Sequence, residues 1–193
     1  MTERDQSPPA NGSGSADPDA ALVAQAQREL PYRTFAFEAL MRRHQSLLFG
    51  VCRRILASHA DAEDVCQDVM FTVFGNLKRF EGRSSFKTWM LRIAKNTCFS
   101  LVERRRRAQE VTAAWSQEAA EEPSNRLDEE AHDLDSLLAQ LKPAEREILT
   151  LRFVADLNLQ EIAEICGLGL SATKMRLYRA TEQLRTLAGI DDE

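Results

Sequence analysis

The spacing of apolar residues is the feature that most constrains the fold of this chain. From Phe35 to Leu56 apolar side chains recur three and four positions apart, as on one face of a helix. Similar spacing predicts a helix from about Asp17, with Asp17 as N-cap and Pro18 as first helical residue, and others over about 60–77, 86–107, 134–141, 143–153, 159–166 and 171–188. No stretch alternates apolar and polar residues like a strand. The sequence therefore predicts an all-α fold of two small helical domains.

Charge is distributed unevenly along the chain, and its reversal marks a boundary between the two domains. Residues 78–107 hold ten basic and two acidic residues, whereas residues 108–135 hold one basic and nine acidic residues. The predicted organisation is a disordered tail over 1–17, a helical domain over 18–107, a flexible acidic linker over 108–133, and a domain containing a helix-turn-helix over 134–189. A basic block of this kind favours a polyanionic partner, although two solvated charge runs that cancel are an alternative on charge alone.

Composition argues against several functional classes. No run approaches the roughly 18 apolar residues of a membrane helix, and the polar first residues lack the apolar core of a secretory signal, so we expect a cytoplasmic protein without membrane insertion. The cysteines, Cys52, Cys66, Cys98 and Cys166, lie far apart and predict free thiols. The three histidines lack metal-binding spacing, and no catalytic or dinucleotide motif stands in its required context. We therefore expect no metal, no cofactor and no enzymatic activity.

The predicted helix over 60–77 has two faces of different character. One face is apolar and predicts a core contact; it holds Ala62, Val65, Val69 and Val73. The opposite face combines acids with an aromatic residue; it holds Asp64, Gln67, Asp68 and Phe71. An ordinary solvated acidic face is one interpretation, but an exposed aromatic side chain among acids favours a partner contact.

Cations and aromatic residues alternate over residues 78–89, just before and inside the next predicted helix. Such a mixture suits single-stranded nucleic acid, because cations hold phosphates while unpaired bases stack on aromatic rings at about 1–3 kcal/mol per base. Within the helix, the predicted buried face holds Phe86, Met90, Ile93, Thr97 and Leu101, and the opposite face holds Thr88, Arg92 and Lys95. For Phe86 a simple core position is the favoured interpretation.

The last 37 residues contain a candidate helix-turn-helix: a short helix over 159–166, a break at Gly167–Gly169, and a longer helix. The predicted buried stripe of the second helix is Thr173, Leu177, Ala180, Leu184 and Leu187. Cations and a tyrosine near its start, on the other side, suit the major groove, where Arg and Lys reach guanine edges and phosphates. A helical hairpin that packs on another protein is the alternative.

Two separated stretches together resemble the extracytoplasmic-function (ECF) sigma factors, the bacterial sigma factors that contain only conserved regions 2 and 4. DAEDVCQDVMFTVF, RFEGRSSFKTWMLRIAKN with its arginine tail, and the terminal helix-turn-helix stand in the family's order and spacing, over about 35–107 and 134–187. The resemblance implies a protein that binds the RNA polymerase core at its clamp helices and flap, directs promoter recognition and transcription initiation, and has no catalysis of its own. It also implies an anti-sigma factor as partner.

The resemblance assigns three groups of residues. Core polymerase binding falls to Asp64, Gln67, Asp68 and Phe71. Minus-ten DNA binding falls to Lys78, Arg79, Phe80, Arg83, Ser84, Ser85, Lys87, Arg92, Lys95, Asn96, Arg104 and Arg105. Minus-thirty-five DNA binding falls to Ser171, Lys174, Met175, Arg176, Tyr178 and Arg179. The acidic linker would run through the channel that nascent RNA later occupies.

The start of the second reading helix departs from the family pattern. Gly169-Leu170-Ser171-Ala172-Thr173 stands where many relatives have a Ser-x-Gly-Thr-Val run, and Gly169 is a poorer N-cap than serine. A free-standing helix-turn-helix regulator that binds operator DNA, with residues 35–107 as a sensing or dimerisation domain, is the main alternative function. A helical adaptor that binds only proteins is a third class. The basic block over 78–107 favours the sigma factor, because a sensing domain does not need it.

Overall fold

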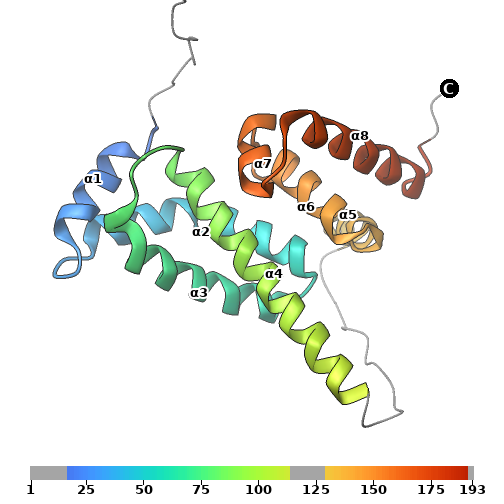
Figure 1. Ribbon diagram of the computed structural model, residues 1–193, viewed down its shortest axis with the longest axis horizontal. Coiled ribbons are helices and arrows are strands. Elements are labelled where there is room, and N and C mark those ends of the chain that lie inside the picture. The colour runs from blue at the N-terminus through green and yellow to red at the C-terminus, as the bar shows by residue number, and fades with distance from the viewer. Residues whose placement is uncertain (1–16, 114–128, 191–193) are drawn as a thin grey trace, which may run out of the picture.

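The computed structural model describes residues 17–113 and 129–190, and these ranges contain helices but no strand (Figure 1). In chain order the elements are α1 (Ala20–Glu29), α2 (Phe35–Leu56), α3 (His59–Asn76), the 3₁₀-helix η1 (Leu77–Arg79), α4 (Phe86–Ala113), α5 (Glu129–Gln140), α6 (Pro143–Leu149), the π-helical turn η2 (Thr150–Val154), α7 (Leu159–Cys166) and α8 (Leu170–Leu187). The prediction of an all-α fold with a C-terminal helix-turn-helix, formed by α7 and α8, is confirmed.

The predicted tail and linker fall largely outside the described residues. Of the tail over 1–17 only Asp17 is described, and of the linker over 108–133 only the two ends are described. Those ends are helical, because α4 continues to Ala113 and α5 begins at Glu129. The helices therefore extend further into the acidic segment than the apolar spacing predicts.

The start of the first helix differs from the prediction. The helix begins at Ala20 behind Asp19, so the expectation that Asp17 is the N-cap and Pro18 the first helical residue is wrong. The Asp17 carboxylate instead accepts hydrogen bonds from the backbone N–H groups of Asp19, at 3.0 Å, and Phe86, at 2.7 Å. Asp17 thus supplies an acceptor for a free N–H at the start of α4, where a negative charge also complements the helix dipole.

Helices α1 to α4 form the N-terminal domain, with α2 packed against the other three. The predicted core face of α3 is confirmed, since Ala62, Val65, Val69 and Val73 are buried. Phe86 and Met90 of α4 are also fully buried, as expected. The buried stripe of α4 then turns toward Leu91, Ala94 and Cys98, while Ile93, Thr97 and Leu101 are only half-buried. The α4 stripe was therefore predicted correctly at its start but about one residue out of phase beyond it.

Helices α5 to α8 form the C-terminal domain, in which α6 and α7 both pack on α8. Helix α7 begins with a capping box, in which the Asn158 side chain accepts from the N–H groups of Gln160 and Glu161. It ends at Gly167, whose φ of 67° is a left-handed conformation that glycine adopts without a side-chain clash. The predicted buried stripe of α8 holds at Thr173 and Ala180 but is wrong at Leu187, which is 38% exposed.

The two domains pack against each other, a contact that no sequence pattern predicted. Helices α6 and α7 and the turn η2 lie against α2 and α4 (Figure 1). Buried apolar side chains of both domains form one continuous cluster. At one end of the contact, Arg53 and Arg54 of α2 both form ion pairs with Asp135 of α5. The chain thus folds as a closed pair of domains.

Candidate nucleic-acid interface

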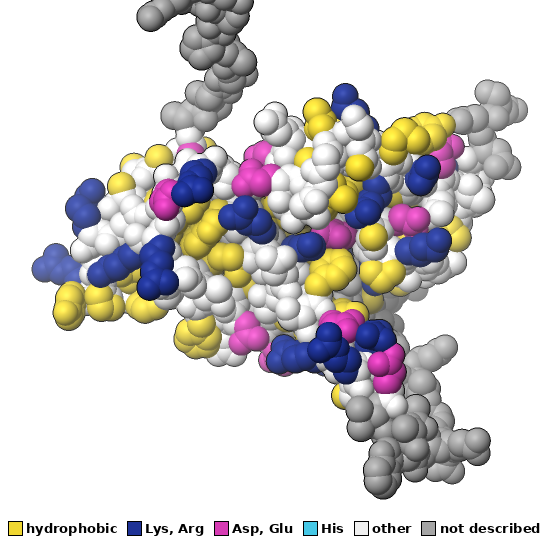
Figure 2. All heavy atoms as spheres, viewed as in Figure 1, with side chains coloured by type: hydrophobic (Ala, Val, Ile, Leu, Met, Phe, Trp, Pro, Cys, Tyr) yellow, Lys and Arg dark blue, Asp and Glu magenta, His cyan; other side chains and the backbone are white. Residues whose placement is uncertain are grey.

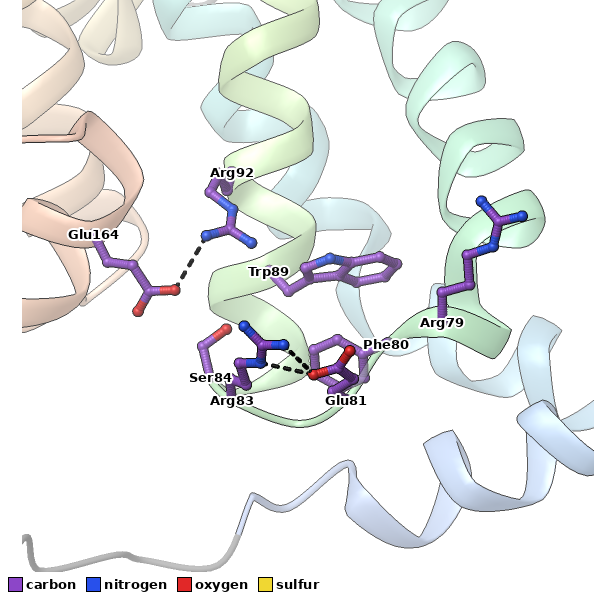
Figure 3. A pocket seen from close by; sticks show the side chains of 8 residues that line it. All are labelled: Arg79, Phe80, Glu81, Arg83, Ser84, Trp89, Arg92 and Glu164. Carbon is purple, nitrogen blue, oxygen red and sulfur yellow. Dashed lines mark hydrogen bonds and ion pairs between the residues drawn. The ribbon is translucent and has the colours of Figure 1, made fainter.

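An aromatic pocket lies where the loop after α3 meets the start of α4. The rings of Phe80 and Trp89 are 4.9 Å apart between centroids, and Phe80 also contacts buried Phe86 edge-on at 6.3 Å. The pocket has a volume of about 400 Å³ and is lined by Arg79, Phe80, Glu81, Arg83, Ser84, Trp89, Arg92 and Glu164. Figure 3 shows the indole of Trp89 facing the loop that carries Phe80, with guanidinium groups on either side. The structure therefore brings together five residues of the predicted minus-ten group.

Basic side chains continue from this pocket along α4. Figure 2 shows Lys and Arg gathered where α3 leads into α4, and again toward the far end of α4. Lys78, Arg79, Arg83 and Asn96 are exposed, whereas Lys87, Arg92 and Lys95 are half-buried. Ser85 takes a local structural position, because its hydroxyl accepts from the N–H of Thr88 at 3.1 Å and so caps the start of α4.

The arginine tail of α4 is largely paired within the domain. Arg105 forms a double hydrogen bond with Asp61 of α3, one arm of which measures 2.5 Å. This contact with the guanidinium lowers the pKa of the Asp61 carboxyl. Arg106 and Arg107 both bond to Glu103, and Arg104 donates to the Ser100 carbonyl oxygen at 3.3 Å. Arg105 therefore lies away from the aromatic pocket and joins α4 to α3.

The acidic face of α3 is largely exposed. Asp64, Gln67 and Asp68 are exposed, and the Phe71 side chain is 67% exposed. Asp64 and Gln67 border a cleft of about 570 Å³ between α2 and α3, which also contains Met41 and Met70. Solvent-exposed acidic residues around exposed apolar side chains are typical of a protein-binding surface.

The second candidate DNA face, on α8, is also open. Ser171, Lys174 and Arg179 are exposed, as are Met175 at 53% and Tyr178 at 64%. Arg176 differs, because it is half-buried and close to Glu147. Burial raises the pKa of the Glu147 carboxyl, and the charges of Lys95 and Arg176 only partly offset that rise. The α8 helix starts after Gly169, which offers no side-chain cap, as the sequence predicted.

Sequence reasoning missed the acidic residues that face α4 from the other domain. Lys87 Nζ donates to the Ala155 carbonyl oxygen at 3.2 Å, and the Thr88 hydroxyl donates to Glu161 Oε1 at 3.0 Å. Thr88, predicted on the open side of α4, is consequently buried. The pairs Arg92–Glu164, at 3.3 Å, and Lys95–Glu147, at 4.0 Å, extend the contact. The capping box marks Glu161 as important to α7, but no local signal pairs these acids with residues about 50 to 70 positions earlier.

Comparison with known proteins assigns both domains. Residues 40–108 match Sigma-70 region 2, and residues 137–186 match Sigma-70 region 4. The chain is 31% identical over 160 residues to the RNA polymerase sigma factor CarQ of Myxococcus xanthus, covering 80% of this chain and 90% of CarQ. It is 30% identical over 180 residues to the ECF sigma factor SigG of Mycobacterium tuberculosis, covering 78% of this chain but 48% of SigG. The chain belongs to the ECF sigma factors.

The fold of this sigma factor agrees with that assignment. It superimposes on CnrH, solved in complex with the cytosolic domain of CnrY, with a TM-score of 0.68 and 26% identity, over 90% of this chain and 99% of CnrH. Region 2 corresponds to α2–α4 with the aromatic pocket and the acidic α3 face, and region 4 corresponds to α5–α8. Among residues 17–113 and 129–190, no helix is long and apolar enough to cross a membrane, and no cluster of His, Cys, Asp or Glu is arranged to hold a metal ion.

Proposed function

We propose that this sigma factor docks on the RNA polymerase core through the acidic α3 face and places two separate DNA-reading surfaces on a promoter. It has no catalysis and no cofactor of its own, and it works in the cytoplasm, where the polymerase is. The observation that carries the proposal is the pocket between Phe80 and Trp89, in which aromatic faces lie beside Arg79, Arg83 and Arg92.

For the minus-ten element, the pocket suits an unpaired base. A base stacked on Trp89 or Phe80 keeps its phosphates within reach of Arg79, Arg83 and Arg92. Lys87, Lys95 and Asn96 continue the polar side of α4 beyond the pocket. We assign recognition of single-stranded DNA to region 2. The match to Sigma-70 region 2 favours a sigma factor over a free-standing regulator that binds operator DNA.

For the minus-thirty-five element, the exposed side of α8 suits the major groove of duplex DNA. Lys174 and Arg179 offer cations to base edges or phosphates, while Met175 and Tyr178 offer apolar contacts. The first helix of the motif, α7, packs on α8 and so fixes the orientation of α8 within the domain.

An apolar groove of about 380 Å³ on region 4 is the proposed seat of the polymerase flap. It lies between α5, η2 and α8 and is lined mainly by apolar residues, five of them leucines, and one of these residues, Phe153, is 67% exposed. It shares no lining residue with the DNA-reading side of α8, so region 4 can hold DNA and polymerase together. The related CnrH was solved with CnrY, and a sigma factor of Bartonella quintana with the anti-sigma factor NepR, so we include an anti-sigma factor among the proposed partners.

Co-elution with bacterial core polymerase, followed by runoff transcription on genomic promoter fragments, tests the proposal. We expect co-elution and specific transcripts from the intact chain, and weaker co-elution for Asp64→Ala. Glu38→Ala, which removes an exposed acid of α2, is the matched control. A chain that binds promoter DNA tightly alone and never joins the core would overturn the proposal in favour of a free-standing regulator.

A further inference from the structure

The loop that carries Phe80 is attached at both ends to α1 and to the segment just before it. This loop, residues 80–85, joins η1 to α4, runs beside α1 (Figure 1) and lines part of the aromatic pocket. We infer that Gln27 of α1 is a positioning residue for the minus-ten base pocket, and that Asp17 holds the other end of the loop. The inference rests on the proposed function of the pocket. Both residues precede the stretch, 40–108, that matches Sigma-70 region 2.

The side-chain amide of Gln27 holds the start of the loop. Its Nε2 donates to the carbonyl oxygens of Leu77, at 2.9 Å, and Phe80, at 2.8 Å. An amide nitrogen carries two hydrogens, so these bonds use its full donor capacity and determine which end of the amide faces the loop. The ring of Phe80 lies 4.9 Å from that of Trp89 between centroids. Gln27 therefore holds the backbone of a pocket wall, although it does not itself line the pocket.

The end of the loop is held from the same side. Asp17 Oδ2 accepts a hydrogen bond from the N–H of Phe86 at 2.7 Å, where α4 begins. Between these anchors the loop turns at Gly82, whose φ of 71° is left-handed. A short loop fixed at both ends samples fewer conformations than a loop fixed at one end. The two contacts therefore restrict the positions of Arg83 and Ser84, which line the pocket.

Packing alone does not fix the position of Phe80. A cavity of about 250 Å³ lies between α1 and the loop, and Phe80 lines both this cavity and the aromatic pocket. Open space on the α1 side leaves Phe80 room to move, because a void supplies no van der Waals contacts. The hydrogen bonds of Gln27 cross that side of the loop. Without them, Phe80 should shift away from Trp89 and the pocket should widen.

Helix α1 can support the loop because it is firmly attached to α2. Its inward side chains Val23 and Ala26 are buried. At its start, the carboxylate of Asp19, which is 1% exposed, accepts a hydrogen bond from Arg43 of α2 at 2.6 Å. Gln27 thus projects from a fixed helix, as the precise placement of a binding site requires.

Removing the two donors while keeping the length of the side chain tests the inference. Gln27→Met does this, and Gln25→Met, which removes the amide of an exposed glutamine on the same helix, is the matched control. Each variant is assembled with core polymerase, so that binding is measured on the holoenzyme. The probe is the labelled single minus-ten strand of a promoter identified by runoff transcription, either intact or with one abasic site at each position in turn.

The readout is the preference for the intact strand over each abasic strand, measured by fluorescence anisotropy. In the parent we expect a preference of about tenfold or more at one position, most of which Trp89→Ala should remove, because the base stacks on this ring. Gln27→Met should reduce the same preference about fivefold or more, because two hydrogen bonds that hold the pocket wall are lost. Co-elution with the core and affinity for a minus-thirty-five duplex should not change.

Asp17 provides a second, independent pair of variants. Asp17→Ala removes the acceptor for the N–H of Phe86 and should lower the preference in the same direction. Asp17→Asn keeps an acceptor oxygen at this place and should retain most of the preference.

A Gln27→Met holoenzyme that keeps the parent preference overturns the inference, and so does an equal loss in Gln25→Met or a loss that extends to core and duplex binding. If Trp89→Ala lowers the preference while Gln27→Met and Asp17→Ala do not, the positioning role is wrong and the proposed function stands. If binding at no position of the strand depends on Trp89, the proposed function of the pocket itself fails.

Discussion

The α4 and α8 surfaces carry the same kind of signal in the sequence but differ in the structure. Each combines cations with aromatic or other apolar side chains on one side of a helix, and each was predicted to bind DNA. On α8 those side chains are largely exposed, whereas on α4 they are half-buried beneath region 4. Charge and periodicity therefore indicate what a surface can bind, while the contact between domains determines how much of that surface is exposed in this structure.

The largest expected effect comes from removing the ring that forms the pocket wall beside α4. Trp89→Ala should weaken binding of the single-stranded minus-ten strand to the holoenzyme by about tenfold to a hundredfold, because one stacked base contributes about 1–3 kcal/mol. Fluorescence anisotropy with the labelled strand measures the loss. Trp89→Phe, which keeps a ring, should recover most of the affinity; equal loss in both variants would contradict a stacking role.

The corresponding test of α8 should affect duplex DNA alone. Lys174→Ala/Arg179→Ala should weaken binding to a minus-thirty-five duplex by about tenfold or more, because each good contact with a base edge contributes about 1–3 kcal/mol. Binding of single-stranded minus-ten DNA should not change. Arg28→Ala/Arg33→Ala, which removes two exposed cations from α1 and from the segment between α1 and α2, is the control for net charge. Equal weakening on both DNA forms would show that the two surfaces do not have separate tasks.

A smaller effect concerns stability at the far end of α4. Asp61→Asn should lower the free energy of unfolding by about 1 kcal/mol at pH 7, because the bond to half-exposed Arg105 is partly screened by solvent. The pKa of Asp61 is lowered in the folded state, so its contribution is present above its ordinary value of 3.8 and is lost as the pH falls through the folded pKa. Urea titrations at pH 7 and pH 3 measure this; a difference between variant and parent that is as large at pH 3 as at pH 7 would contradict the assignment.

Much of the local structure follows from the sequence alone, because it depends on neighbours three and four residues apart. The limits of α2 and α7, the core face of α3 and the break at Gly167 were all predicted in this way. The start of α1 was not, because the carboxylate of Asp17 bonds to Phe86, 69 positions along the chain. The buried position of Thr88 escaped prediction for the same reason, since its acceptor belongs to the other domain.

The candidate site likewise has a part that the sequence predicts and a part that depends on contacts between distant residues. Periodicity and charge bring Phe80, Trp89 and the nearby cations into one region, and the structure adds that they form a pocket. The sequence does not reveal that Glu164 lines this pocket. Its ion pair with Arg92 joins the two domains, and such a pair depends on how the domains pack against each other. The same holds for Arg105, whose charge resembles that of its neighbours but whose partner, Asp61, lies on α3.

The smallest predicted effect distinguishes two arginines of α8 that the sequence treats alike. Burial raises the pKa of Glu147, and half-buried Arg176 partly offsets that rise, whereas Arg179 is exposed. Arg176→Ala should therefore cost less affinity for the minus-thirty-five duplex than Arg179→Ala, about twofold against about tenfold, in keeping with the cost of one lost base contact. The main consequence of Arg176→Ala should be a less stable domain. Glu147 then has fewer positive charges nearby, and the pKa of its carboxyl should rise further. Duplex titrations on both variants, with thermal unfolding beside them, measure the two effects. Equal losses of DNA affinity would mean that Arg176 turns outward when region 4 meets the promoter.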